Sequence, residues 1–410
     1  MTGEQSQTTG EQPVLVYTQK SLARMVAHLS RQPAFALDTE SNSFYAYYPK
    51  VCLIQITTFD DSTDSADSGT PGVPGAPDTP QLVDYLVDPL RLDSLDALST
   101  LVAEGTHEVV MHAAENDVLQ LQRDFGMRFR RIFDTQLAAR ILGWEKVGLA
   151  PLLEEHFGAI SDKRMQRTDW TTRPLSAQQI AYAAMDTHYL LAMRDLLTER
   201  LHEAGRWEEA QEAFAQLAEV DADDRTPQPR TFWQMKVSHS VDLKHSGVLE
   251  ALWQWREQEA QRLNRPPFKV MSDESLAALA TLRPRTAADL NGIASLNPHQ
   301  IRRYGASLVA AVLEGTLRPL PELPRSAPRP ELLLSPADQA RFEKLRRWRT
   351  ETARRRGVGP EIVFSNDTLL EIVQRSPATE AELLQVSGIG PWKAGTYGRE
   401  LFALLNGHPE

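Results

Sequence analysis

The first half of the 410-residue chain alternates short apolar runs with segments that have a helical pattern. Apolar runs of this length predict buried strands, and they fall at residues 14–18, 34–37, 51–59, 84–89 and 107–113. Strands that alternate with helices favour a mixed sheet flanked by helices. We therefore expect one α/β domain over residues 13–220, preceded by a disordered start at residues 1–12.

Two acids, Asp38 and Glu40, follow the apolar run that ends at Leu37. Because side chains two apart in a strand point to the same side, both carboxylates lie on one face. Such a pair is tolerable when a cation lies between them, and oxygen ligands suit magnesium or manganese. Taken alone, the pair is more often two solvated acids at the end of a strand.

A third acid, Asp117, lies in the first turn of a helix predicted over residues 115–126, directly after a strand. Acids at helix starts usually cap the helix or interact with its dipole, but this position leaves Asp117 able to face Asp38. A fourth acid, Asp134, precedes another predicted helix, and we assign it to capping rather than to chemistry.

Ser176 is predicted to cap a long helix that carries Tyr182 and Asp186. These two residues are four apart, so they are neighbours on one helical face. This spacing can place a carboxylate on a metal ion while a phenol holds a water one turn away. In isolation, the segment is more often a helix with a few polar positions.

Two loops in this half have unusual compositions. Residues 44–48 contain four aromatic side chains, which either stack nucleic-acid bases or pack a loop against the sheet. Residues 60–80 are rich in Asp, Ser, Gly and Pro, and their lack of apolar surface predicts a mobile insertion.

The second half contains an internal repeat with an offset of 93 residues, which pairs Trp255 with Trp348 and Tyr304 with Tyr397. Fifteen of 51 aligned positions are identical at this one register, so we expect two copies of a small helical domain. The predicted segments are a linker at 221–243, a first copy at 244–316, a Pro-rich linker at 317–335 and a second copy at 336–408.

Charge is divided unevenly, with a net −17 over residues 1–224 and +6 over residues 225–410. This asymmetry is expected if one half gathers metal ions and the other approaches phosphates, although surface charge without function explains it about as well. The single cysteine, Cys52, excludes an intrachain disulfide and fits a reducing cytosol. No secretion signal and no apolar run of about 20 residues is present, so we expect a cytoplasmic protein without membrane contact.

In combination, the motifs D-x-E, a helix-opening Asp and Y-x-x-x-D resemble the DEDD superfamily of 3′-to-5′ exonucleases, in its tyrosine subclass. Within it, the segments LDTES, VCLIQI, IFDTQLAARILG, TDWTTRPLS and YAAMDTHYL are similar to those of the ribonuclease D family. The repeated domain resembles the HRDC domain of helicases and ribonuclease D. The resemblance implies a ribonuclease H-like α/β exonuclease domain followed by two small all-α HRDC domains.

The resemblance also implies roles for five residues around two divalent cations, Mg²⁺ or Mn²⁺. Asp38 is expected to bridge both ions, Glu40 and Asp186 to hold the first, and Asp117 to reach the second through water. Tyr182 is expected to orient the attacking water, since a phenol with a pKa near 10 is a poor base at neutral pH. Two ions about 3.5 to 4 Å apart suit in-line displacement at a phosphodiester.

Several basic or glycine residues are candidates for contact with nucleic acid. In the second HRDC copy, the sequence SGIGPWKAG opens a helix whose free amides are able to hold a phosphate. Arg173 either contacts a phosphate or pairs with a surface acid. The remaining candidates for phosphate contact are Lys163, Arg164, Arg167, Arg346, Arg347, Gly388, Gly390 and Lys393.

We therefore expect an exoribonuclease that releases 5′-mononucleotides from RNA 3′ ends, with precursors of tRNA as the substrate that the family implies. One alternative is a DNA-directed exonuclease on the same fold, because the residues above bind any phosphodiester. Another is a catalytically silent RNA-binding protein. No protein partner follows from the sequence.

Overall fold

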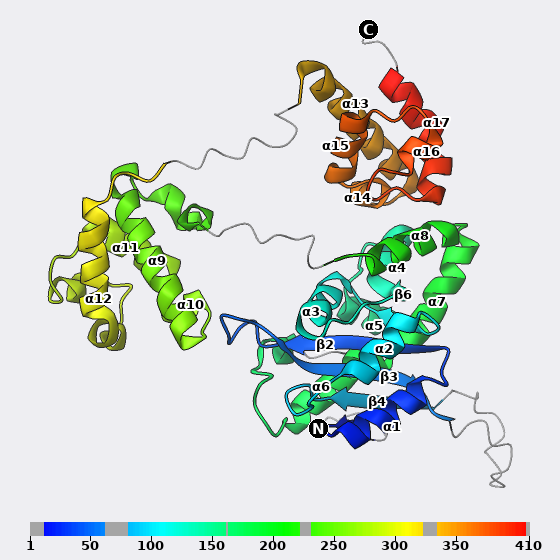
Figure 1. Cartoon of the computed structure of the whole chain (residues 1–410), viewed down its shortest axis with the longest axis horizontal. Coiled ribbons are helices and arrows are strands. Elements are labelled where there is room, and N and C mark those ends of the chain that lie inside the picture. Colours follow the sequence, from blue (N-terminus) through cyan, green and yellow to red (C-terminus); the bar gives the residue numbers. More distant parts are fainter. Residues whose placement is uncertain (1–11, 62–80, 161–162, 222–230, 323–333, 407–410) are drawn as a thin grey trace, which may run out of the picture. The chain divides into compact units, whose positions relative to one another are not determined.

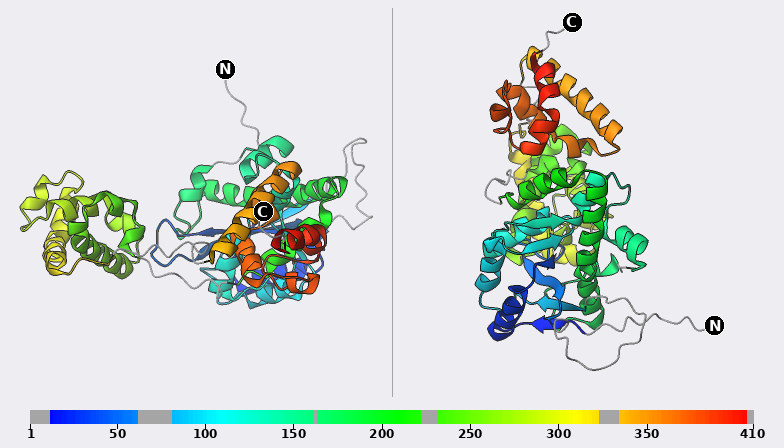
Figure 2. Two further views of the ribbon diagram at one scale, coloured as in Figure 1. Left: turned by 90° about the horizontal axis from the view of Figure 1, so that it is seen from above. Right: turned by 90° about the vertical axis from the view of Figure 1, so that its right-hand side faces the viewer.

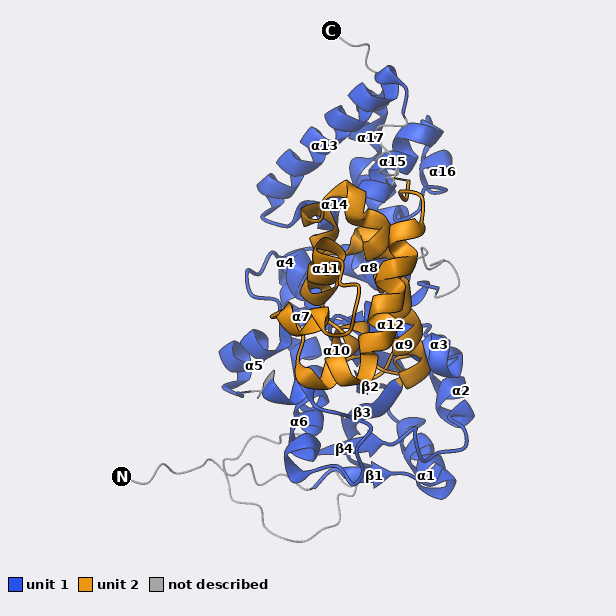
Figure 3. Ribbon diagram, turned by 90° about the vertical axis from the view of Figure 1, so that its left-hand side faces the viewer, with its two compact units in different colours: residues 1–41, 51–224, 330–410 blue, residues 42–50, 225–329 orange. Residues whose placement is uncertain are grey.

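The structure is a computed structural model that describes residues 12–61, 81–160, 163–221, 231–322 and 334–406. Nearly all of the predicted insertion at 60–80 and of the predicted disordered start, and part of each predicted linker, lie outside these residues. The chain forms two compact units (Figure 3). One contains Met1–Ser41, Val51–Asp224 and Pro330–Glu410, and the other contains Asn42–Lys50 and Arg225–Arg329. The domain boundaries given above stay a prediction.

A six-stranded sheet lies at the centre of the first unit (Figure 1). Strand β3 is antiparallel to both of its neighbours, and the other neighbouring pairs are parallel. This mixed sheet confirms the predicted α/β class. In spatial order the strands are β1 (Val14–Val16), β4 (Leu82–Val87), β3 (Val51–Phe59), β2 (Ala34–Ser41), β5 (Glu108–Met111) and β6 (Ile132–Asp134).

Helices cover both faces of this sheet, as the alternation along β2 shows. Phe35 and Leu37 pack with the first three helices, whereas Ala34 and Ala36, on the opposite face, pack with α4, α5, α7 and α8. The helices are α1 (Gln19–Leu29), α2 (Asp96–Glu104), α3 (Glu115–Phe125), α4 (Thr135–Leu142), α5 (Leu149–Phe157), α6 (Ala177–His188), α7 (Leu190–Glu203) and α8 (Trp207–Ala218), with a 3-10 helix at Lys163–Arg167.

Side-chain caps fix the starts of the helices that matter for the site. Ser176 caps α6 in a reciprocal capping box with Gln179, as predicted. Asp134 caps α4 by accepting from the amides of Gln136 and Leu137, which confirms its assignment to capping. Helix α6 ends at His188 and α7 begins at Leu190, with Tyr189 as the cap that they share, so the predicted long helix is two consecutive helices.

The repeated domains have matching helices at the predicted offset. For example, α10 and α14 begin at Pro267 and Pro360. The first copy contains α9 (Ser246–Leu263), α10 (Pro267–Val270), α11 (Asp273–Leu282) and α12 (Pro298–Leu317), with 3-10 helices at Phe232–Gln234, Lys236–Ser240, Leu243–His245 and Asp289–Gly292. The second contains α13 (Pro336–Arg356), α14 (Pro360–Val363), α15 (Asn366–Arg375), α16 (Glu380–Leu383) and α17 (Pro391–Asn406).

The aromatic loop after β2 belongs to the second unit, where it contacts α9 and α10. The Tyr47 hydroxyl donates to Glu257 at 3.0 Å and accepts from Gln261 at 3.0 Å. The Lys269 ammonium lies 3.5 Å from the centre of the Tyr45 ring. Of the two predicted roles for these aromatic side chains, the structure gives Tyr45 and Tyr47 packing contacts, although with helices rather than with the sheet.

One helix start explains why the second copy groups with the sheet. In the first copy, Asn297 caps α12 with its own side chain. The equivalent position in the second copy is Gly390, which has no side chain to cap α17. Instead, Glu212 of α8 accepts from the amides of Gly390 at 3.1 Å and Trp392 at 2.6 Å. A side chain at position 390 would overlap Glu212, so this contact requires glycine.

Burial strengthens the same contact. Arg356 of α13 forms an ion pair with Glu209 of α8, whose side chain is only 1% exposed. Ile362 packs into the cluster built by α4, α5, α7 and α8. Glycine is also required at position 143, where any side chain would overlap the carbonyl of Gly357. The second HRDC domain is therefore an integral part of the unit that contains the sheet.

Replacement of Glu209 tests this contact. Glu209→Ala leaves Arg356 half-buried without its acid, so we expect a loss of about 3 kcal/mol in the free energy of unfolding. The matched control is Glu208→Ala, which removes an exposed acid from the preceding position and is expected to change stability little. Urea denaturation measures both variants, and equal stabilities would contradict the role of the pair.

No helix among the described residues is both long and apolar enough to cross a membrane.

Candidate active site

Three elements bring the predicted site residues together on one face of the sheet. Strand β2 presents Asp38 and Glu40 on the same face, and α6 packs across this face of β2, β3 and β4. The crossing is fixed by a hydrogen bond of 2.7 Å between the hydroxyls of Thr57 and Thr187. Helix α6 thereby carries Tyr182 and Asp186 over the two acids of the strand.

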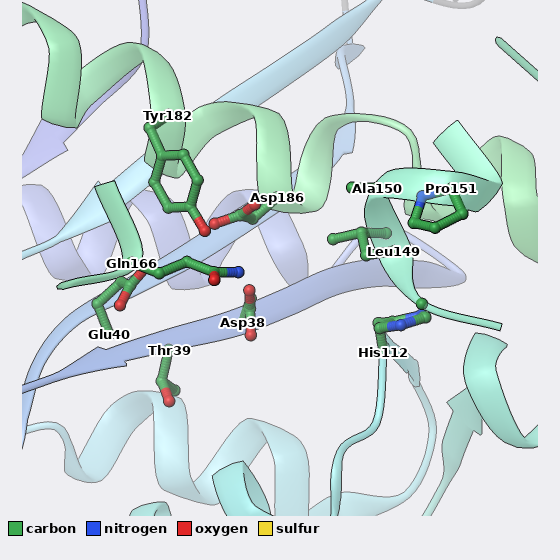
Figure 4. Close-up of a pocket in the computed structure, with 11 residues that line it drawn as sticks. Asp38, Thr39, Glu40, His112, Leu149, Ala150, Pro151, Gln166, Tyr182 and Asp186 are labelled. Atoms are coloured by element: carbon green, nitrogen blue, oxygen red, sulfur yellow. The ribbon is translucent and has the colours of Figure 1, made fainter. Parts of the chain in front are cut away.

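These residues border a pocket of about 410 Å³, with Asp38 on its floor and the Tyr182 hydroxyl directed at Asp186 (Figure 4). The N-terminal end of α5 and the 3-10 helix that carries Gln166 supply further walls. The lining residues are Asp38, Thr39, Glu40, His112, Gly148, Leu149, Ala150, Pro151, Gln166, Tyr182 and Asp186.

Asp117 lies just outside this lining, half-buried beside the strand residue Thr39. The Thr39 hydroxyl donates to its carboxylate. The loop that leads into α3 is fixed by Asp134, which accepts from the amides of Ala113 at 3.1 Å and Ala114 at 2.8 Å. Asp134 therefore caps α4 and also fixes the start of α3, the helix that contains Asp117.

The four acids repel one another when ionised, because Asp186 is buried, the other three are half-buried, and all carry the same sign of charge. Burial raises the pKa of Asp38, and the charges of Asp117, Asp186 and Glu40 raise it further. Burial, together with Asp186 and Asp117, raises the pKa of Glu40 to about 9. Burial also raises the pKa of Asp117 to about 6 and that of Asp186 to about 7. The protein thus holds these carboxyls in an arrangement that disfavours their full ionisation.

Tyr182 is held as a neutral phenol. Burial is the largest cause of its raised pKa, followed by the charges of Asp186 and Glu40. Its hydroxyl donates to Asp186 and accepts from Gln166. A phenol in this environment does not lose its proton near neutral pH, so it is suited to positioning a water and unsuited to acting as a base.

The donor set fits hard divalent cations. Carboxylate oxygens are the ligands that Mg²⁺ and Mn²⁺ prefer, and a dication relieves the repulsion that raises these pKa values. Within the described ranges, no three Asp, Glu, His or Cys side chains are gathered tightly enough to hold one ion as they stand. The Asp117 carboxylate accepts from the Thr39 hydroxyl and the Asp186 carboxylate from the Tyr182 hydroxyl, so each already uses part of its acceptor capacity within the protein.

The basic candidates lie in different surroundings. Arg164 and Arg167 are exposed in the 3-10 helix that borders the pocket. Arg173 forms a two-pronged ion pair with Asp88, at 2.6 and 2.9 Å, and donates to the carbonyl of Cys52 at 2.8 Å. Of its two predicted roles, the structure favours pairing with an acid, which here is largely buried.

The candidates for phosphate contact in the second HRDC domain are likewise of two kinds: exposed side chains, and groups that already bond within the protein. Arg346 and Arg347 are exposed on α13, and Arg346 pairs with Glu343 at 3.3 Å. In the glycine-rich turn, the amide of Gly390 already donates to Glu212, and the Lys393 ammonium donates to the carbonyl of Gly388 at 3.3 Å. The anion at this helix start is a carboxylate of the protein itself. A phosphate would have to displace it, so the predicted contact at these three residues lacks support here.

Sequence reasoning missed four residues that shape the pocket. Thr39 lies between the two acids of β2, and strand alternation directs its side chain to the opposite face, so the D-x-E motif does not mark it. Asp134 was identified as a cap, but its contacts with Ala113 and Ala114 are not visible from the pattern. His112 and Gln166 lie in a strand end and a polar segment that carried no periodic signal.

Comparisons with known proteins agree with this arrangement. A family model described as 3′-5′ exonuclease matches residues 13–202, and the HRDC domain model matches residues 245–312 and 338–405. The mixed sheet with its acidic pocket thus defines a 3′-to-5′ exonuclease.

Relatives that match nearly the full length of the chain identify the family within this class of exonucleases. Ribonuclease D of Gluconacetobacter diazotrophicus is 31% identical and covers 96% of this chain and 93% of its own. Ribonuclease D of Granulibacter bethesdensis is also 31% identical and covers 98% and 95%. The chain belongs to the ribonuclease D family and is a 3′-to-5′ exoribonuclease.

Solved structures agree on the fold. Escherichia coli RNase D superimposes with a TM-score of 0.61 at 23% identity and covers 97% of this chain and 100% of its own. A protein from Bifidobacterium adolescentis superimposes with a TM-score of 0.74 at 21% identity, and the match covers 96% and 97% of the two chains.

The raised pKa values predict how stability depends on pH. In the folded protein these carboxyls hold protons that the unfolded chain, with pKa values near 4, has already released. Their stabilising contribution is complete below about pH 4, and it is lost as the pH rises through the folded values of about 6, 7 and 9. In a chelator, we therefore expect the melting temperature to fall between about pH 5 and pH 9.

Two variants distinguish the contribution of the pocket acids to this pH dependence from that of acids elsewhere on the chain. Asp186→Asn removes one titrating acid and should flatten the pH profile of the melting temperature. Asp195→Asn, which changes an exposed acid on the next helix, should leave the profile as it is. Mg²⁺ should raise the melting temperature more at high pH than at low pH, because it binds the ionised acids. If Asp186→Asn has the same pH profile as the unchanged protein, the acids of the pocket are not the cause of the pH dependence.

Proposed function

We propose that the chain shortens RNA from its 3′ end, one 5′-mononucleotide at a time, with precursors of tRNA as substrate and two divalent cations, Mg²⁺ or Mn²⁺, at the pocket. The observation that carries this proposal is the convergence of Asp38, Glu40, Asp186 and the Tyr182 phenol on one pocket, with Asp117 held beside it by Thr39. The single cysteine, Cys52, and the reducing conditions that it suits support action in the cytosol.

Each residue of the site is given a role from its position. Asp38 lies on the floor of the pocket, where it can bridge two ions, and Glu40 and Asp186 can hold the first of them. Asp117, which accepts from the Thr39 hydroxyl, would reach the second through water. When bound, the cations supply a more acidic water and stabilise the leaving oxygen. The Tyr182 hydroxyl, beside Asp186, would orient the attacking water.

Basic side chains of the 3-10 helix beside the pocket and of α13 would receive the RNA backbone. Arg164 and Arg167 are exposed on the short helix that also positions Gln166 in the wall. Lys163 belongs to the same segment. Arg346 and Arg347 offer exposed charge on α13 of the second HRDC domain. Phosphate contacts of this kind raise affinity without selecting a sequence.

Replacement of Asp38 tests the central role. Asp38→Ala should abolish release of nucleotides from a 3′-extended tRNA precursor with Mg²⁺ or Mn²⁺ present, while the protein stays folded. Chelation should abolish release by the unchanged protein, and a blocked 3′ end should prevent it. Matched RNA and DNA single strands in the same assay measure the preference for the 2′-hydroxyl. Unaltered hydrolysis by Asp38→Ala would remove Asp38 from the reaction.

Replacement of the phenol tests positioning of the water. Tyr182→Phe keeps the ring packing but removes the hydroxyl, so we expect turnover to fall about 100-fold, because small displacements of a reacting group have effects of this size. Its affinity for Mn²⁺, measured by calorimetry, should stay close to that of the unchanged protein. Equal losses in turnover and in Mn²⁺ affinity would mean that the phenol supports the ions instead.

A further inference from the structure

A buried amide, Gln55 of β3, lies beside the acidic cluster. In the register of the sheet it is directly opposite Asp38 of β2 on one side and Leu86 of β4 on the other. Opposite residues of neighbouring strands share a face, with Cβ atoms about 4.5 to 5.5 Å apart. The side chain of Gln55 therefore lies on the face that carries the predicted cation ligands, next to the residue on the pocket floor.

Helix α6 closes over this position. On one side along β3, Thr57 is hydrogen-bonded to Thr187 of the helix. On the other side, Leu53 packs in one cluster with Tyr182 and Ala183. The stretch of helix between these contacts contains Asp186, and Gln55 is fully buried beneath it. The amide is thus enclosed between an acid of the strand and an acid of the helix.

The amide has no partner within the described part of the chain. Neither Nε2 nor Oε1 of Gln55 has a hydrogen bond there, although both atoms are buried. A buried polar group without a partner is costly, and nearly all such groups in native proteins are paired. The neighbouring residues Thr57 and Thr58 follow this rule, since both hydroxyls are fully buried and hydrogen-bonded. Gln55 is therefore an exception, which points to a hydrogen bond that forms only when the ligand of the site is bound.

We propose that Gln55 is a positioning residue of the cation site, whose Nε2–H donates to the Asp38 carboxylate when cations are bound. This inference rests on the proposed function. A hydrogen bond to one oxygen of a ligating carboxylate fixes its rotation, so that the remaining lone pairs face the ions. A neutral amide suits this place because it adds no charge, whereas a lysine or arginine would compete with the cations for the acids.

The variant Gln55→Met tests this role, because it keeps an unbranched side chain of similar size but removes both amide atoms. We expect its affinity for Mn²⁺, measured by calorimetry without RNA, to fall about 10- to 100-fold, as is typical when such a supporting hydrogen bond is lost. Turnover should recover at saturating Mn²⁺. The melting temperature in chelator should stay the same or rise, because an unpaired amide has been removed.

The matched control is Thr58→Val. Thr58 is a fully buried residue of the same strand, its side chain lies on the opposite face from Gln55, and its hydroxyl donates to the Ala34 carbonyl. This variant should lower the melting temperature without altering Mn²⁺ affinity. Unchanged Mn²⁺ affinity in Gln55→Met would overturn the inference and assign the amide to a buried water. Asp38→Ala distinguishes failure of this inference from failure of the proposed function. If Asp38→Ala also binds Mn²⁺ like the unchanged protein, the proposed cation site itself is wrong.

Discussion

Repulsion between buried carboxyls is the constraint on which this structure depends. Asp38 and Glu40 share a face of β2, and α6 holds Asp186 over them, so the fold forces like charges together around one pocket. Such an arrangement is unfavourable for the isolated chain. It becomes favourable when cations enter, which explains why a stable sheet and a capped helix are used to hold it.

The second HRDC domain shows how one residue redirects a repeated module. Both copies begin their last helix at the same register of the repeat. Asn297 caps the helix of the first copy with its own side chain, whereas Gly390 leaves the amides of the second helix free to donate to Glu212. The buried Glu209 and Arg356 complete the contact. As a result, a domain that resembles a nucleic-acid module contributes its glycine-rich turn to the architecture of the unit that contains the sheet, while Arg346 and Arg347 of α13 stay exposed.

Much of this was accessible from the sequence because it depends on local patterns. Apolar runs predicted the strands, Ser176 and Asp134 predicted helix starts, and the 93-residue offset predicted matching helices in the two copies. Contacts between distant elements were not accessible. Nothing in the pattern indicates that Glu212 would occupy the turn at Gly390, or that Gln55 would be opposite Asp38, since both follow from packing and register rather than from periodicity.

The most direct test of the central claim is anomalous X-ray diffraction from crystals of the full chain soaked in Mn²⁺. Convergence of the four acids on two cations predicts two strong peaks in the pocket, each within coordination distance of Asp38, with Asp186 and Glu40 turned to the first. A pocket without peaks, or peaks bound elsewhere on the chain, would contradict the account.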